Sequence, residues 1–464
     1  MRFLAVDLGA TFIKSAVLDL DALRLLRVQR APFPPFLEGG NRRAREVDPE
    51  VILAVVRREV ESLLALEPTI EGIVLCGQMH GLVLTDPGGK ALSNVVSWQD
   101  QRSLLPSESS SSGSTYFDVL ASALTDEERV ELGNELRPGL PIATLFWMRE
   151  SGSLPSGDVV PASLSDFVAA RLCDSPVVTD RTNAAAYGSF FVEAGRWHEA
   201  VIEKLGLEKL RWPKILGAQA RVGYLSHRSR RIPVFVPLGD QQAGLLGSFL
   251  ERSELSVNVA TGSQVASIIP VYQSGPWQVR PYFDDMYIKT VTHIPAGRAL
   301  NVLVKLISEL ATSAEGDIDP WGYALDRLEG TPRTDLHVDL SFFSSTTGSA
   351  GAITNIQEDN LTVGHLLRGA VTAMAESYAR YAGQLGGEGQ WRTIAFSGGL
   401  ARKSRSLREA ISAAVALPHR MAGSNEETLQ GLLCHALVVS GRKSSASEAA
   451  RDLKRADERG HRWS

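Results

Sequence analysis

Cysteine and histidine are scarce in this chain, and neither forms a metal-binding pattern. The 464 residues include three cysteines, Cys76, Cys173 and Cys434, which lie far apart in apolar surroundings, and 9 histidines without a metal-ligand spacing. Cysteines placed in this way are typical of reduced core residues rather than of a disulfide framework. We therefore expect a protein of a reducing compartment.

Long apolar runs and an excess of positive charge are also missing. No stretch is apolar enough to span a bilayer, and the N-terminus lacks the basic and apolar regions of a secretory signal. The net charge is -5, so the composition gives no reason to expect a nucleic-acid partner. With 44% hydrophobic residues and a length that suits two large domains, the chain is expected to be a globular cytoplasmic protein.

The first twenty residues predict a hairpin. Residues 3–6 and 12–20 are typical of strands, and the turn between them is rich in small residues. Such a turn could cradle phosphate groups, with a magnesium ion held by a carboxylate through water. An ordinary hairpin with a glycine turn explains the pattern equally well. The candidates are Asp7 for magnesium and Gly9, Thr11 and Lys14 for phosphate.

A helix and a buried strand are predicted next. Residues 24–45 look irregular and contain several prolines. Asp48 is expected to cap a helix over residues 49–66, whose apolar positions keep helical spacing. Residues 70–76 then predict a buried strand.

Two polar clusters follow predicted strands. Gly77-Gln-Met-His-Gly81 comes directly after the strand of residues 70–76, and Trp98-Gln-Asp-Gln-Arg102 follows a short apolar segment. Sugars carry a donor and an acceptor on each hydroxyl and an apolar face that stacks on indole, so these side chains suit a polyol. Two polar turns with a satisfied histidine are the alternative. The candidate sugar-binding residues are Gln78, Met79, His80, Trp98, Asp100 and Arg102.

A carboxylate near the middle of the chain is the candidate catalytic group. Residues 234–238 predict a buried strand, residues 239–242 a tight turn, and residues 243–250 the start of a helix. Asp240 would then lie at a strand end, where it could accept a proton from a hydroxyl. On this stretch alone, an aspartate that merely caps the helix is the more frequent case. Gln241 beside it is a further candidate for sugar binding.

The hairpin pattern returns in the second half. Residues 255–269 predict strand, small-residue turn and strand, an echo of residues 3–18. A duplicated fold would produce two such hairpins, which could hold one polyphosphate between two domains. Residues 391–396 predict a strand that leads through the double glycine 398–399 into a helix. Backbone of this kind lets a purine or ribose approach closely, although a glycine pair is weak evidence by itself.

Several of these stretches together resemble the FGGY carbohydrate kinases. The resemblance rests on Gly77–Gly81, Trp98–Arg102 and Gly239-Asp240-Gln241, and it extends from residue 1 to about residue 440. Within the family, the Trp-Gln-Asp form and Asn183–Gly188 are most similar to sedoheptulokinases, with xylulokinases next. Each motif alone is weak evidence, but several in the family's order are strong.

The resemblance implies an α/β fold of the duplicated, actin-like and ribonuclease-H-like type, with a central cleft between residues 1–244 and 245–464. It implies transfer of the γ-phosphoryl group of ATP, with Mg2+, to a hydroxyl of a small-molecule ketose by a monomer or homodimer, with Asp240 as the base. Sedoheptulose is the first candidate and xylulose or another polyol the second. An actin-like or chaperone-like ATPase without a sugar substrate is the alternative from another class.

The resemblance also implies nucleotide contacts in the second half of the chain. These are Thr261, Gly262, Gly398, Gly399, Ala401 and Lys403. The chain departs from the usual family pattern at Ala10, Ala260 and Lys403, which puts individual contacts in doubt but not the phosphate cradle as a whole.

Overall fold

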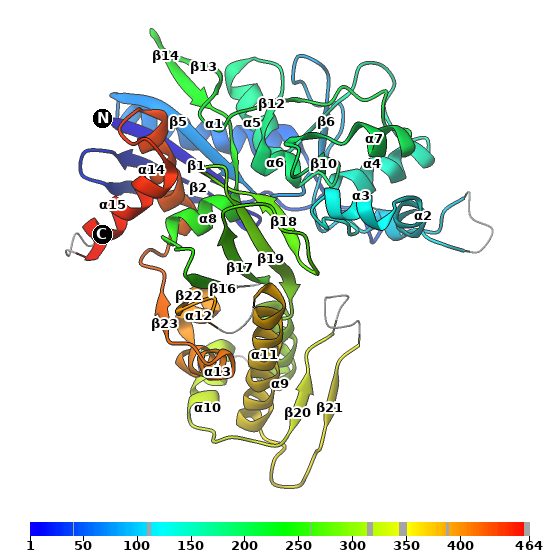
Figure 1. Cartoon of the computed structure of the whole chain (residues 1–464), viewed down its shortest axis with the longest axis vertical. Coiled ribbons are helices and arrows are strands. Elements are labelled where there is room, and N and C mark those ends of the chain that lie inside the picture. The colour runs from blue at the N-terminus through cyan, green and yellow to red at the C-terminus, as the bar shows by residue number, and fades with distance from the viewer. Residues whose placement is uncertain are drawn as a thin grey trace.

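The structure is a computed structural model built around two β-sheets, one in each half of the chain (Figure 1). It describes residues 1–39, 41–108, 113–260, 262–312, 319–342, 350–386 and 389–458. The first sheet has the order β13 (Arg221–His227), β14 (Arg230–Phe235), β5 (Ile70–Gly77), β1 (Arg2–Leu8), β2 (Phe12–Asp19) and β3 (Arg24–Pro32), and β15 (Leu238–Gly239) also pairs with β5. The second has the order β18 (Gln278–Pro281), β19 (Tyr287–Ile294), β17 (Ser263–Ile269), β16 (Glu254–Val259), β22 (Thr393–Ser397) and β23 (His419–Met421).

The two sheets repeat one topology. In each, a central hairpin, β1–β2 or β16–β17, pairs antiparallel with a third strand, β3 or β19. The first strand of each hairpin pairs in parallel with a strand reached through a long helix, β5 after α1 (Pro49–Leu66) and β22 after α11 (Val363–Leu385). The duplicated, actin-like α/β fold predicted from the sequence is therefore confirmed.

The elements form where the sequence favours them. Asp48 caps α1 by accepting a hydrogen bond from the backbone N–H of Glu50, and Pro49 fills the first turn, where its missing N–H costs nothing. Strands β1 and β5 are apolar and buried because protein covers both faces of the sheet.

Two predictions of local structure are wrong. The segment expected to be irregular from residue 24 begins with strand β3, which pairs with β2 as far as Pro32. The turn expected over residues 239–242 is absent, because helix α8 (Asp240–Gly247) begins at Asp240 itself.

Helix α8 and its counterpart α14 (Glu427–Val439) cross in contact between the two sheets. A Cβ atom on Gly247 would lie 1.8 Å from the carbonyl oxygen of Glu427, and one on Gly431 would lie 1.9 Å from that of Ala243. Glycine at both positions lets the backbones touch. The surrounding core includes side chains of both sheets, among them Phe3 and Ile268.

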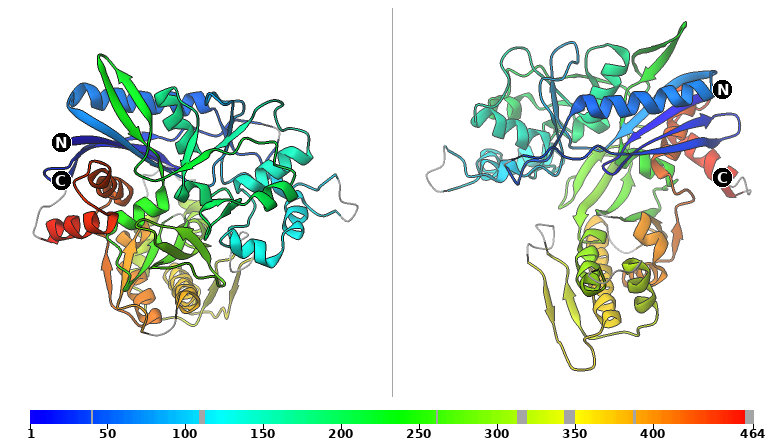
Figure 2. Two further views of the ribbon diagram at one scale, coloured as in Figure 1. Left: turned by 45° about the horizontal axis from the view of Figure 1, so that its top comes forward. Right: turned by 180° about the vertical axis from the view of Figure 1, so that it is seen from behind.

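The C-terminal helices return to the first sheet. Helix α14 contacts β1, β2, β3 and β5, and α15 (Ala446–Glu458) packs against α8 and α14. The rear view in Figure 2 shows the red C-terminal segment beside the blue strands of the first half. The domain boundary predicted after residue 244 falls within α8, and its position remains a prediction.

Shorter elements complete the described chain. In the first half they are β4 (Glu46–Val47), β6 (Val83–Thr85), β7 (Val95–Val96), η1 (Arg102–Leu104), α2 (Tyr116–Ala123), α3 (Asp126–Glu131), α4 (Pro141–Glu150), β8 (Val160–Ala162), α5 (Leu164–Cys173), β9 (Val178–Asp180), α6 (Arg181–Ala185), β10 (Phe190–Phe191), β11 (Arg196–Trp197), α7 (Glu199–Lys204) and β12 (Lys214–Leu216). In the second half they are α9 (Gly297–Thr312), α10 (Pro320–Glu329), β20 (His337–Asp339), β21 (Ala352–Thr354), α12 (Gly399–Lys403) and α13 (Arg405–Val415). None of the helices in the described ranges is long and apolar enough to cross a membrane.

Candidate active site

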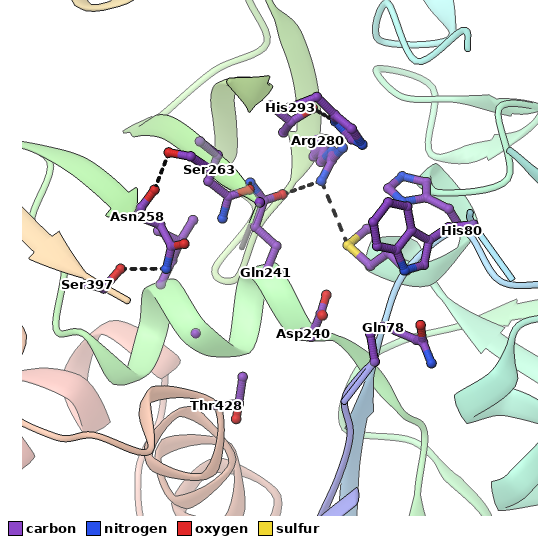
Figure 3. A pocket seen from close by; sticks show the side chains of 18 of the residues that line it. Gln78, His80, Asp240, Gln241, Asn258, Ser263, Arg280, His293, Ser397 and Thr428 are labelled. Atoms are coloured by element: carbon purple, nitrogen blue, oxygen red, sulfur yellow. Dashed lines mark hydrogen bonds between the residues drawn. The ribbon is translucent and has the colours of Figure 1, made fainter. Parts of the chain in front are cut away.

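A cleft of about 380 Å³ lies between the two halves of the chain, at the ends of their central strands (Figure 3). The chain up to and including helix α8 contributes Ala10, Gln78, Met79, His80, Trp98, Arg137, Asp240, Gln241, Gly244 and Leu245. The second half contributes Asn258, Gly262, Ser263, Gln264, Arg280, Thr292, His293, Ser397, Glu427 and Thr428.

The cleft brings together part of the predicted site. Its lining contains the predicted residues Gln78, Met79, His80, Trp98, Asp240, Gln241 and Gly262. As far as the described chain forms it, the lining does not contain Asp7, Gly9, Thr11, Lys14, Asp100, Arg102, Gly398, Gly399, Ala401 or Lys403. Thr261 lies outside the described residues.

Asp240 is the first residue of α8 and lines the cleft. The N-cap position belongs to Gly239, so the alternative in which Asp240 serves only as the helix cap does not fit the geometry. Burial, together with the nearby charge of Asp7, raises the pKa of Asp240 to about 7. A carboxylate with this pKa is suited to accept a proton near neutral pH.

Buried residues of α6 hold the backbone just before Asp240. The N–H of Gly239 donates to the hydroxyl of Thr182 at 2.9 Å, and this hydroxyl donates to the carboxylate of Asp180 at 2.8 Å. The side-chain amide of Asn183 donates to the carbonyl of Pro237 at 3.0 Å. Asn183, the first residue of the stretch that carried part of the family resemblance, therefore helps to hold the backbone that leads into Asp240.

Asp7 is buried at the base of the cleft. Its carboxylate accepts hydrogen bonds from the hydroxyl of Thr428 at 2.5 Å and from the thiol of Cys76 at 3.6 Å. Burial raises the pKa of Asp7, while Lys14, whose Nζ lies 4.0 Å away, opposes that effect. A hard oxygen ligand of this kind suits magnesium, which usually binds one or two carboxylates and keeps several waters. The residues present thus fit the ion. Within the described ranges, no group of three or more acidic, histidine or cysteine side chains is arranged to hold a metal ion by itself.

The two hairpin turns border the cleft, whose lining includes Ala10 and Gly262. A Cβ atom on Gly9 would lie 2.9 Å from the carbonyl oxygen of Phe12, so the first turn needs glycine. At the position that a Cβ of Gly262 would take, no described atom lies within 4 Å, which leaves the second turn open to a ligand. Lys14 pairs with Glu426 at 2.9 Å, so its ammonium is already neutralised by a carboxylate.

The double glycine after β22 has two different roles. Gly398 has φ 90°, and its Cβ would lie 2.5 Å from the carbonyl oxygen of Val259, so only glycine fits there. Gly399 faces open space, with no described atom within 4 Å of where its Cβ would be. Ala401 is buried and Lys403 is exposed.

Asp100 and Arg102 lie behind the cleft and contact each other. The carboxylate of Asp100 accepts the backbone N–H groups of Arg45 at 2.8 Å and of Arg102 at 2.9 Å. The guanidinium of Arg102 also pairs with Glu46 at 2.5 Å and lies 4.5 Å over the ring of Trp147. These contacts fix the loop that carries Trp98, and direct sugar binding by Asp100 and Arg102 remains a prediction.

The sequence motifs missed a charged cluster at the other end of the cleft. The carboxylate of Glu135 is fully buried, pairs with Arg280 at 2.5 Å and lies 3.8 Å from Arg137. Arg137 donates to the hydroxyl of Thr292 at 3.0 Å and contacts His293 at 2.7 Å. The one sequence signal for this cluster is an arginine between the apolar residues Val279 and Pro281 of β18.

Two histidines contact the guanidinium of Arg137: a ring nitrogen of His80 lies 3.0 Å from it and a ring nitrogen of His293 lies 2.7 Å from it. Burial and the charge of Arg137 lower the pKa of His80 to about 3 and that of His293 to about 3, so both rings are neutral near pH 7. Their φ angles are 72° and 63°, a conformation that is uncommon for residues other than glycine and is often found at functional sites.

Comparison with known sequences identifies relatives. The sequence profile of the FGGY family of carbohydrate kinases, N-terminal domain, matches residues 2–247. Sedoheptulokinases of Mus musculus and Homo sapiens are each 25% identical to this chain, over 79% of it and 82% of their own length. A glycerol kinase of Marinomonas sp. is 26% identical over 53% of this chain and 50% of its own length.

Solved structures share the fold. A xylulose kinase from Lactobacillus acidophilus superposes with a TM-score of 0.83 at 16% identity, covering 98% of this chain and 96% of that structure. Plasmodium falciparum glycerol kinase with ADP superposes with a TM-score of 0.81 at 16% identity, covering 97% and 92%. The profile match extends over more than half of the residues, and the chain belongs to the FGGY family of carbohydrate kinases.

Proposed function

We propose that this ATP-dependent sugar kinase phosphorylates a ketose, with sedoheptulose as the first candidate acceptor and xylulose as the second. The observation that carries the proposal is the carboxylate of Asp240, which lines a cleft between two glycine-containing hairpin turns and has a pKa near neutrality. The preference for sedoheptulose rests on the sedoheptulokinases, which match 79% of the chain.

In the proposed reaction, Asp240 accepts the proton of the sugar hydroxyl as that oxygen attacks the γ-phosphorus, and the bond between this phosphorus and the β-phosphate oxygen breaks to release ADP. The hairpin turns at Ala10 and Gly262 would surround the phosphates, and Asp7 would hold Mg2+, which would neutralise phosphate charge. Phosphoryl transfer depends mainly on positioning and charge neutralisation, so few reacting side chains are needed. Gln78, His80 and Trp98 bind the sugar on the first-half wall of the cleft.

The rate should depend on pH through Asp240. The carboxylate must be ionised to accept a proton, so kcat/KM for the sugar should rise with pH and reach half of its plateau at a pH of about 7. His80 and His293 should not contribute, because their pKa values lie near 3. Initial rates from about pH 5 to about pH 9 at saturating ATP and magnesium measure this rise of kcat/KM with pH. A flat profile above about pH 5 would mean that the base is ionised throughout.

A panel of acceptors tests the substrate. Sedoheptulose, xylulose, ribulose, glycerol and gluconate should be compared by a coupled ADP-release assay, with kcat/KM as the criterion. We expect the highest value for sedoheptulose, because the likeness to sedoheptulokinases spans most of the chain. A higher kcat/KM with xylulose or glycerol would overturn the choice of substrate and leave the kinase activity intact.

A further inference from the structure

Gln241, which the sequence motif predicts as a sugar ligand, has both ends of its side chain engaged by the second half of the chain. Its amide nitrogen donates to the side-chain oxygen of Gln264 at 3.0 Å and to the hydroxyl of Thr290 at 3.3 Å. Its amide oxygen accepts a hydrogen bond from Arg280. Figure 3 shows Gln241 pointing from α8 toward Arg280, beside Asp240.

Arg280 is itself fixed by contacts with the first half. It lies on β18, is 3% exposed, and its Nε donates to the buried carboxylate of Glu135 at 2.5 Å. Its Nη1 reaches both Gln241 and, at 3.9 Å, the sulfur of Met79. A planar guanidinium held at two nitrogens has one orientation, so Arg280 presents a rigid donor to Gln241.

The position of Gln241 makes this link relevant to catalysis. Gln241 follows Asp240 in the first turn of α8, where backbone N–H groups lack helical partners, and residues of the first half hold the backbone that precedes this turn. Bonds from Gln241 to β17, β18 and β19 tie that turn to the second sheet. Displacement of a reacting group by about 1 Å can lower a rate about 10²-fold.

We infer that Gln241 and Arg280 are positioning residues that fix Asp240 against the second half of the chain, so that phosphoryl transfer requires the two halves to be in contact. Gln241 then contributes to turnover and not to sugar affinity. The inference rests on the proposed role of Asp240 as the base.

The test compares Gln241→Met, Arg280→Met and the double variant, using the best acceptor from the panel. Methionine keeps the size of glutamine but can neither donate nor accept the amide hydrogen bonds. We expect each single variant to lower kcat about 10-fold to 100-fold with ketose KM changed less than about threefold, because the lost contact acts on geometry. The double variant should be about as slow as the slower single variant, since both residues belong to one link.

Asp285→Asn is the matched control. Asp285 also bridges the halves, through an ion pair with Arg181 at 3.2 Å, but its side chain is exposed and lies outside the cleft lining. The φ of Asp285 is 54°, and that of the preceding Asp284 is 56°. Asparagine tolerates this backbone conformation, so the variant should fold and keep wild-type kcat and KM. Arg280→Lys retains a cation beside Glu135 and supplies a folded alternative if Arg280→Met is unstable.

The outcomes separate the inference from the proposed function. A raised ketose KM with unchanged kcat in Gln241→Met would make Gln241 a sugar ligand and overturn the inference. So would wild-type turnover in both single variants, or additive losses in the double variant. If Asp240→Asn keeps its turnover, the role of Asp240 as the base fails instead, whatever the other variants show.

Discussion

Asp240→Asn should lower kcat by about 10²-fold to 10⁴-fold while binding of magnesium-ATP stays close to wild type. The amide keeps the shape of the carboxylate but cannot take up the proton of the sugar hydroxyl. The two hairpin turns and the glycine pair after β22 are unchanged, so the nucleotide should still bind. Ketose affinity should fall only modestly, because one hydrogen-bonding group is altered and not deleted. Steady-state kinetics and calorimetric titration of both ligands measure these quantities.

Asp48→Asn provides the control for a purely structural role. Asp48 is a true helix cap, which accepts the N–H of Glu50 at 2.8 Å and is not part of the cleft lining, and asparagine caps helices about as well as aspartate. This variant should keep full turnover and a wild-type melting curve. If Asp240→Asn behaved in the same way, Asp240 would not be the base. Melting curves for both variants separate a folding defect from a catalytic one.

Gly247→Ala should destabilise the protein strongly, by about 1–3 kcal/mol or more. The new Cβ would lie 1.8 Å from the carbonyl oxygen of Glu427 and 2.5 Å from the backbone nitrogen of Gly431. Both are backbone atoms of α14, so no side chain can rotate away to make room. Helices α8 and α14 would have to separate, and Thr428, which binds Asp7, would move with α14. Chemical denaturation measures the loss of stability, and the KM for ATP should rise in the folded fraction.

Gly244→Ala is the matched substitution on the same helix. The nearest atom to its Cβ would be the methyl carbon of Thr428 at 3.9 Å, an ordinary van der Waals contact. Alanine also restricts the unfolded chain, which favours folding by about 0.4–1 kcal/mol where the backbone allows it. We expect this variant to be as stable as the wild type or more so. Equal stability of the two alanine variants would mean that α8 and α14 can move apart at their crossing with little loss in the free energy of unfolding.

The sequence predicted the repeated framework because the signals there are local. Buried strands appear as apolar runs, and α1 carries both an aspartate cap and helical spacing of its apolar residues. The small-residue turns at Gly9 and Gly262 recur at corresponding places in the two halves, which reveals the duplication. Strand β3 was missed because Arg24–Pro32 alternates charged and apolar residues irregularly and includes Arg27 at φ 50°.

The sequence by itself determined the buried central strands, the two hairpins, the family and the motifs that place Gln78, His80 and Asp240 at one cleft. Only the tertiary structure decided which polar groups remain free to act there. Arg280 and Glu135 are separated by 145 positions, yet they form one buried ion pair. Such pairs depend on how the second sheet packs against the first half, because residues are buried together when they are close in space, however far apart they lie along the chain. The same burial, with the charge of Asp7, raises the pKa of Asp240 toward neutrality, which no sequence pattern encodes.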